Sequence, residues 1–371
     1  MQSSNATFIS GLDLSESFYR EAVEPIVREE CAEISYSAAL IGSGSEVLGL
    51  DNMMSTDHHW GPRVMLFLKE EDVNRHSARL TQVLSERLPR RFRGYPTSYS
   101  PATGPGEAPG VQLLDYSETG PINHRVSIES ARDFIRQYLG FDIEHDITAA
   151  DWLTFPDQKL LSITAGRVFH DGVGLKELRS RFAYYPHDVW LYLLASQWTR
   201  IEQEEHLMGR AGSVGDEIGS AIIAARLVRD VMRLCFLMER QYAPYPKWFG
   251  TAFKRLEVAP YLEPRLRQVL SAENWKEREE YLAQVYEYVA DRHNRLGITD
   301  TMPTKVSPFH DRPYKVISMG AFSSAIAAKF SDSAIKEIGK RRLIGSVDQI
   351  SDSTDLLADS TWREALCRLY Q

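Results

Sequence analysis

The sequence predicts an α/β domain at residues 1–178 followed by an all-α domain at residues 179–371. In the first part, short apolar runs of strand length alternate with segments of helical periodicity. In the second part, long helical patterns dominate. A chain of 371 residues is also longer than a typical single core, so two domains are expected.

The elements of the first domain follow from the spacing of its apolar residues. Helical spacing predicts helices over 15–33, 72–88 and 131–138. Short apolar runs predict strands over 35–41, 64–68, 111–114 and 124–129, and a strand with a turn over 160–171. The segment 90–110 is rich in proline, glycine, serine and tyrosine, so we expect a loop or lid there.

In the second domain, helical spacing predicts helices over 188–207, 216–242, 274–296, 318–331 and 361–370. Asp216 and Glu217 stand just before a run of apolar residues. This is typical of a helix N-terminus, where acidic side chains interact favourably with the helix dipole.

The net charge, the cysteines and the hydropathy of the chain indicate which partners and which cellular compartment to expect. The net charge of −8 argues against nonspecific nucleic-acid binding, which needs clustered Lys and Arg, so no nucleic-acid partner is expected. The cysteines Cys31, Cys235 and Cys367 are too widely spaced for a metal knuckle, which fits a reducing cytosol. Neither a signal peptide nor a membrane-spanning apolar run is visible, so a cytoplasmic protein without a membrane partner is expected.

The most informative stretch is a glycine-serine loop directly after a predicted strand. It consists of Gly42, Ser43, Gly44 and Ser45. A helix-like segment then leads to Asp57 at the edge of the next predicted strand. Glycines let the backbone approach a phosphate, and a carboxylate beside them can hold Mg²⁺ against it. The tetrapeptide alone is more typical of a flexible loop or helix cap, so the prediction depends on the combination.

This combination resembles the DNA polymerase beta-like nucleotidyltransferase superfamily, whose hallmark is Gly-Ser, a short helical stretch and Asp-x-Asp on a neighbouring strand. Within it, the chain is similar to an uncharacterised branch that carries Ser-Thr-Asp-His-x-Trp-Gly-Pro-Arg after the Gly-Ser loop. Segments at 209–210, 215–220, 245–250 and 345–349 extend the likeness over most of the chain. The helical part resembles that of aminoglycoside-type nucleotidyltransferases. The resemblance implies a mixed β-sheet with flanking helices, followed by a helical bundle.

Residue by residue, the resemblance implies that Gly42 and Ser43 hold phosphates and that Asp57 binds Mg²⁺ or Mn²⁺. The second Asp of the family pattern falls on His59. An imidazole suits Zn²⁺ better than Mg²⁺ and supplies no negative charge. Either His59 belongs to an altered metal site, or the site binds nucleotide without transferring it. The resemblance also implies a third carboxylate, for which Glu129 is favoured over Asp115.

Two cations are candidates for nucleotide binding. Arg63 follows Trp-Gly-Pro and could face the phosphates, or it could form a structural salt bridge. Lys247 follows a proline-rich turn in the second domain. Glu202 and His206 share a helix face and could bind a metal or an amine, although a solvated helix face is the commoner explanation.

The predicted function is metal-dependent transfer of a nucleoside monophosphate, with AMP from ATP favoured, to a hydroxyl or amine of a small acceptor. Pyrophosphate is the second product. One alternative is a nucleotide-binding pseudoenzyme or regulator; another is an ATP-dependent activating enzyme or phosphotransferase. Modification of nucleic-acid ends is disfavoured because the chain has no basic stripe. The sequence predicts no oligomeric state.

Overall fold

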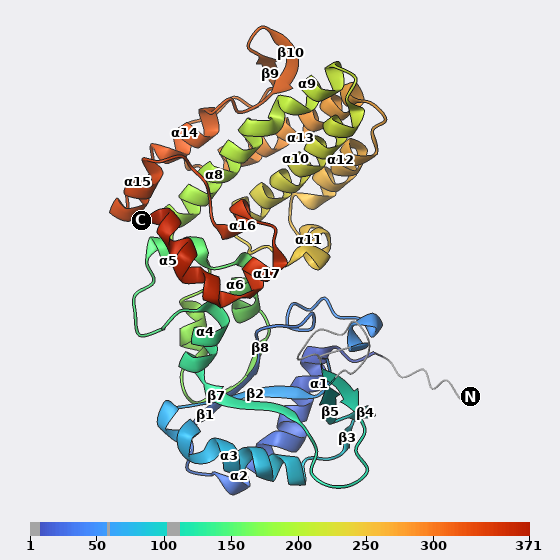
Figure 1. The fold of residues 1–371 in the computed structure, drawn as a ribbon, viewed down its shortest axis with the longest axis vertical. Coiled ribbons are helices and arrows are strands. Elements are labelled where there is room, and N and C mark those ends of the chain that lie inside the picture. The colour runs from blue at the N-terminus through green and yellow to red at the C-terminus, as the bar shows by residue number, and fades with distance from the viewer. Residues whose placement is uncertain (1–7, 58–59, 102–111) are drawn as a thin grey trace, which may run out of the picture. The chain divides into compact units, whose positions relative to one another are not determined.

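The chain forms two compact units in the computed structural model, which describes residues 8–57, 60–101 and 112–371 (Figure 1). The first unit contains the residues up to Asp146 together with Lys159–Ala183. The second contains Ile147–Gln158 and Tyr184–Gln371. The chain therefore passes between the units three times.

A four-stranded mixed sheet organises the first unit, as expected from the sequence. Its strands are β1 (Tyr36–Leu40), β2 (Arg63–Leu68), β7 (Arg125–Ser130) and β8 (Arg167–Asp171), in the order β7-β2-β1-β8. β1 is antiparallel to both β2 and β8, whereas β2 and β7 are parallel. The parallel pair brings the beginnings of β2 and β7 to the same edge of the sheet, with Arg63 opposite Arg125.

Helices cover both faces of this sheet. The predicted N-terminal helix is observed as α1 (Gly11–Phe18), a π-helical turn (Tyr19–Val23) and α2 (Glu24–Glu30). Together with α3 (Glu70–Arg87), it packs on the face that carries Val64, Leu66 and Leu68. On the other face, α4 (Ala131–Leu139) places Phe134 with its ring centroid 5.7 Å from that of Phe67. α7 (Leu175–Ser180) completes the unit.

Two predictions for the first unit are wrong. The segment 160–164 is helical, within α6 (Asp157–Thr164), because Leu160 and Ile163 are buried one helical turn apart. A turn at Gly166 (φ +74°) then leads into β8. The segment 90–101 is also not a plain loop. It contains β3 (Arg91–Phe92), β4 (Tyr95–Pro96) and β5 (Ser98–Pro101), and β5 pairs with β6 (Gln112–Asp115).

The second unit is helical apart from one hairpin. Its longer helices are α8 (His187–Glu205), α10 (Glu217–Met238), α12 (Ala259–Ser271) and α13 (Trp275–Arg295). Its shorter helices are α5 (Ala149–Thr154), α9 (Leu207–Ser213), α11 (Pro246–Phe253), α14 (Ala321–Ala327), α15 (Ser333–Gly339), α16 (Val347–Ile350), α17 (Thr354–Ala358) and α18 (Arg363–Cys367). Single 3₁₀ turns flank α18 at Ser360–Trp362 and Arg368–Tyr370. The hairpin of β9 (Ser307–Phe309) and β10 (Arg312–Val316) was not predicted.

Local signals explain where the long helices begin. Asp216 caps α10 by accepting a hydrogen bond from the Gly219 N–H at 2.7 Å, which confirms the predicted helix N-terminus. Asn274 caps α13 in the same way. α8 is buried on nearly all sides, and its Trp198 ring stacks on Phe322 at 4.1 Å. Among the described helices, none is both long and apolar enough to cross a membrane.

Candidate functional site

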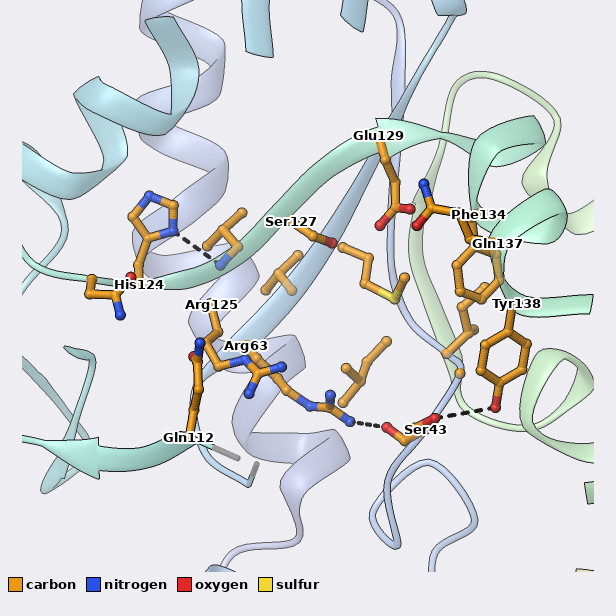
Figure 2. Close-up of a pocket in the computed structure, with 17 residues that line it drawn as sticks. Ser43, Arg63, Gln112, His124, Arg125, Ser127, Glu129, Phe134, Gln137 and Tyr138 are labelled. Carbon is orange, nitrogen blue, oxygen red and sulfur yellow. Dashed lines mark hydrogen bonds between the residues drawn. The ribbon is translucent and has the colours of Figure 1, made fainter. Parts of the chain in front are cut away.

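A cavity of about 520 Å³ lies in the first unit, over the sheet face that α4 covers in part (Figure 2). Polar side chains from several elements reach it: Ser43, Arg63, Gln112, Arg125, Ser127 and Glu129. Phe134 and Tyr138 of α4 also line it. A volume of this order suits a small-molecule ligand.

Strand alternation explains why these side chains meet. Successive residues of a strand point to opposite faces of a sheet. On β7, Val126 belongs to the core, so Arg125, Ser127 and Glu129 face the cavity. On β2, Val64 and Leu66 are core residues, and Arg63 therefore shares the cavity face.

The glycine-serine loop forms one wall of the cavity. Gly42 adopts φ +81° and its N–H donates to the Ser162 carbonyl at 2.9 Å, so this donor is already used within the fold. Ser43 is exposed, and its Oγ lies 3.4 Å from the Tyr138 hydroxyl. Gly44 adopts φ +141°, and a Cβ there would lie only 2.4 Å from Arg63 Nη2. Glycine at this position therefore allows Arg63 to approach the loop.

Arg63 joins the loop to β2. Its Nη2 donates to the Ser43 carbonyl at 2.6 Å and lies 2.6 Å from Glu46 Oε1. The Glu46 side chain is only 4% exposed and that of Arg63 13% exposed. From the sequence, Arg63 was expected either to form a structural salt bridge or to face a ligand. In the structure it forms a salt bridge with Glu46 and also lines the cavity. Ser45 contributes its carbonyl to the loop by accepting the Leu50 N–H at 2.9 Å.

Arg125 is a site residue that the sequence reasoning missed. Its guanidinium carbon lies 5.6 Å from the Tyr99 ring centroid. Burial and the positive charge of Arg63 lower the pKa of Arg125. The sequence does contain a signal for Arg125. Together with Ser127 and Glu129 it occupies alternate positions of the predicted strand, so the three side chains share one face of the sheet.

Glu129 lies at the other end of the cavity from the two arginines, as Figure 2 shows. Burial raises the pKa of this carboxyl group, and a hydrogen bond with Ser127 partly offsets the effect. Asp115, the other candidate for a third carboxylate, is exposed at the end of β6. Of the two, Glu129 is the one that lines the cavity.

The structure places Asp57 differently from expectation. Asp57 ends a 3₁₀ helix (Met53–Asp57), whereas β2 begins only at Arg63, so Asp57 is not on the strand. The segment after the Gly-Ser loop is a series of turns and not a helix, because Gly44 and Gly49 both have positive φ. His59 and its neighbour His58 lie outside the described residues. No group of three His, Cys, Asp or Glu side chains suited to a metal occurs in the part of the chain that the structure describes.

The remaining candidates lie in the second unit. Lys247 is exposed in the first turn of α11, with its ammonium 5.0 Å from the Trp248 ring centroid. The His206 ring stacks on Phe309 at 4.2 Å, and Glu202 forms a hydrogen bond with Ser323. Both members of the Glu202–His206 pair therefore have structural partners.

Comparison with known proteins adds a limited likeness. A family described as "Domain of unknown function (DUF4037)" matches residues 152–249, which is less than half of the chain. No curated protein matches the sequence. A solved structure of a nucleotidyltransferase-like protein from Exiguobacterium sibiricum 255-15 matches with a TM-score of 0.32 and 11% identity, covering 79% of this chain and 83% of that one.

Proposed function

We propose that the first unit binds a nucleoside triphosphate in this cavity and transfers its nucleoside monophosphate to a hydroxyl or amine of a small acceptor. AMP from ATP is the favoured case, by resemblance. The observation that carries the proposal is the meeting of Arg63 and Arg125 beside the Gly-Ser loop, with Glu129 at the opposite end. This arrangement separates an anion-binding end from an end with a proton acceptor.

The charges suit a polyphosphate. Two guanidinium groups face one buried carboxylate, that of Glu46, at the loop end of the cavity. Planar guanidinium groups bind phosphate oxygens through paired hydrogen bonds. The Ser43 hydroxyl, which lies in the same wall, adds a donor for a phosphate oxygen.

In the proposed reaction, the acceptor oxygen or nitrogen attacks the α-phosphorus, and the bond from that phosphorus to the pyrophosphate oxygen breaks. Glu129 accepts the proton that the acceptor loses, and its raised pKa makes it a stronger base than an exposed carboxylate. Arg63 and Arg125 stabilise the negative charge that develops on the departing pyrophosphate.

The described residues do not fit a metal site by themselves. Mg²⁺ needs carboxylate oxygens and near-octahedral geometry, and no suitable cluster occurs among the residues that the structure describes. Asp57 and His59 remain the proposed ligands for Mg²⁺ or Mn²⁺.

A second candidate is a protein that binds the nucleotide without transferring it. The observation that favours it is His59, which stands where the family pattern has its second Asp. On this alternative, the arginines still bind the triphosphate and Glu129 has no catalytic task.

Product analysis separates the candidates. The full chain is incubated with ATP labelled at the α-phosphate, Mg²⁺ or Mn²⁺, and a panel of small alcohols and amines, with water as the minimal acceptor. A labelled product with stoichiometric pyrophosphate supports transfer, and Glu129→Gln should slow its formation about 10²- to 10⁴-fold. Binding of ATP without either product supports the second candidate. Formation of ADP contradicts the proposed reaction.

A further inference from the structure

A second and larger cavity, of about 780 Å³, lies within the second unit. α8, α14 and the connection from α15 to α16 supply most of its walls, and Ile350 and Leu369 complete it. A smaller cavity of about 260 Å³ shares Arg341 and Arg342 with it. The predicted function of the first unit makes no use of this region.

Positive charge gathers on one side of the larger cavity. Arg341 and Arg342 are exposed side chains that line it, and neither takes part in an ion pair among the described residues. The neighbouring Lys340, by contrast, pairs with Glu337. Such a pair of uncompensated guanidinium groups is notable in a chain whose net charge is −8.

The inner wall holds one further cation and one acid. Arg200 lies 3.4 Å from the Asp230 carboxylate, which is only 1% exposed, so that charge is compensated inside the fold. Among the described residues, Glu202 is the one acid in the lining, and burial raises the pKa of its carboxyl group. Arg341 and Arg342 therefore leave the cavity with an excess of positive charge.

Apolar side chains gather in the same cavity. Ile344, Ile350 and Leu369 are 40%, 44% and 43% exposed, and all three line it. Single exposed aliphatic side chains are common on protein surfaces, but a cluster of them is typical of a ligand-binding or interaction site. Covering such side chains with the apolar part of a ligand removes them from water and so favours binding.

We propose that this cavity binds a small organic anion with an apolar part. Arg341 and Arg342 hold a carboxylate or phosphate group, and Ile344, Ile350 and Leu369 cover the hydrocarbon part. A few polar groups beside an apolar wall are the usual composition of a small-molecule site. This inference does not depend on the proposed function of the first unit.

Calorimetric titration of the full chain tests it, with hexyl phosphate and hexanoate as probes. One of them should bind with a stoichiometry of one, and Arg341→Ala with Arg342→Ala should weaken it about tenfold or more. Lys336→Ala removes an exposed positive charge nearby that does not line the cavity, and should leave the affinity unchanged. Inorganic phosphate and hexanol alone should bind more weakly than the favoured probe, because each lacks one of the two parts.

A second set of variants excludes binding at the first cavity and a loss of folding. Arg125→Ala should leave probe binding unchanged, whereas Ile344→Asp should abolish it by placing a negative charge on the apolar wall. The circular dichroism of each variant should match that of the parent. Absence of binding by both probes at millimolar concentration, or binding that survives the double arginine substitution, would overturn the inference.

Discussion

Arg63 and Arg125 are direct partners in the parallel register of β2 and β7. Neighbouring strands lie about 4.8 Å apart, so the two guanidinium groups share one end of the cavity. Arg63 is held by Glu46 and by the Ser43 carbonyl, and the pKa of Arg125 is lowered by burial and by Arg63. A bound polyanion would relieve the repulsion between the two cations.

Arg125→Gln should therefore weaken binding of a nucleoside triphosphate. A hydrogen bond between charged groups is worth about 1.5–3 kcal/mol, so a loss of roughly 10- to 150-fold is expected. The dissociation constant is measured by calorimetry at low and moderate salt, and the variant should show the smaller salt dependence. Arg79→Gln is the control, because it removes an exposed arginine that pairs with Glu30 on α2. An equal loss in both variants would mean that only net charge matters.

Gly44→Ala should disrupt the Gly-Ser wall. The new Cβ would lie 2.4 Å from Arg63 Nη2 and 2.6 Å from Glu46 Oε2, in a backbone conformation (φ +141°) that favours glycine. We expect a lower melting temperature and weaker triphosphate binding. Gly49→Ala is the matched control: it has φ +61° but no atom within 4 Å of the new Cβ. It should lower the stability by about 1 kcal/mol through backbone strain and leave binding unchanged. Equal effects on binding would contradict the role given to Gly44.

Glu129→Gln should separate binding from reaction. Because burial raises the pKa of Glu129, the proton-accepting form accumulates only at a pH above the usual range of a glutamate. The rate of pyrophosphate release should rise with pH through this raised pKa. The variant should lose about 10²- to 10⁴-fold in rate and should lack this pH dependence, with little change in triphosphate affinity. A variant with the parent's pH profile would exclude Glu129 as the base.

Asp348→Asn should change how stability depends on pH. Burial and the neighbouring Asp157 raise the pKa of Asp348 to about 7, whereas Arg233 acts in the opposite direction. The folded state thus binds more protons than the unfolded state between about pH 4 and pH 7. The contribution of Asp348 to the free energy of unfolding therefore falls as the pH rises through this window and is constant above it.

Asparagine keeps the side-chain oxygen that accepts the Asp157 N–H at 2.8 Å, and it cannot ionise. The free energy of unfolding, measured with urea between pH 4.5 and pH 8, should exceed that of the parent increasingly towards neutral pH. Curves for the two proteins that run parallel over the whole range would contradict this assignment.

Local patterns in the sequence were sufficient for much of the fold. The predicted strands at 35–41, 64–68 and 124–129 and the helix at 72–88 agree with the structure to within two residues at each end. The strand predicted at 160–164 failed because a short apolar run does not distinguish a buried strand from a buried helix. The hairpin of β9 and β10 depends on pairing between strands that carry little apolar alternation.

The site was less accessible to sequence reasoning because it depends on contacts between distant segments. Arg63 was a candidate, yet its partner Arg125 lies 62 residues later and becomes significant only through the strand register. Asp57 was expected at the edge of the next strand, but it ends the 3₁₀ helix Met53–Asp57, and β2 begins only at Arg63. The resemblance implied a third carboxylate but did not choose between Glu129 and Asp115, and only the structure shows which of them lines the cavity.

The most direct test of the central claim is calorimetric titration of the full chain with ATP, GTP, CTP and UTP, each with and without Mg²⁺ or Mn²⁺. Arg125→Ala and Asp57→Ala are titrated in parallel. We predict binding of at least one triphosphate that is strengthened by the metal, weakened in the Arg125 variant, and no longer strengthened by the metal in the Asp57 variant. Absence of binding for all four triphosphates would contradict the claim that this cavity is a nucleotide site.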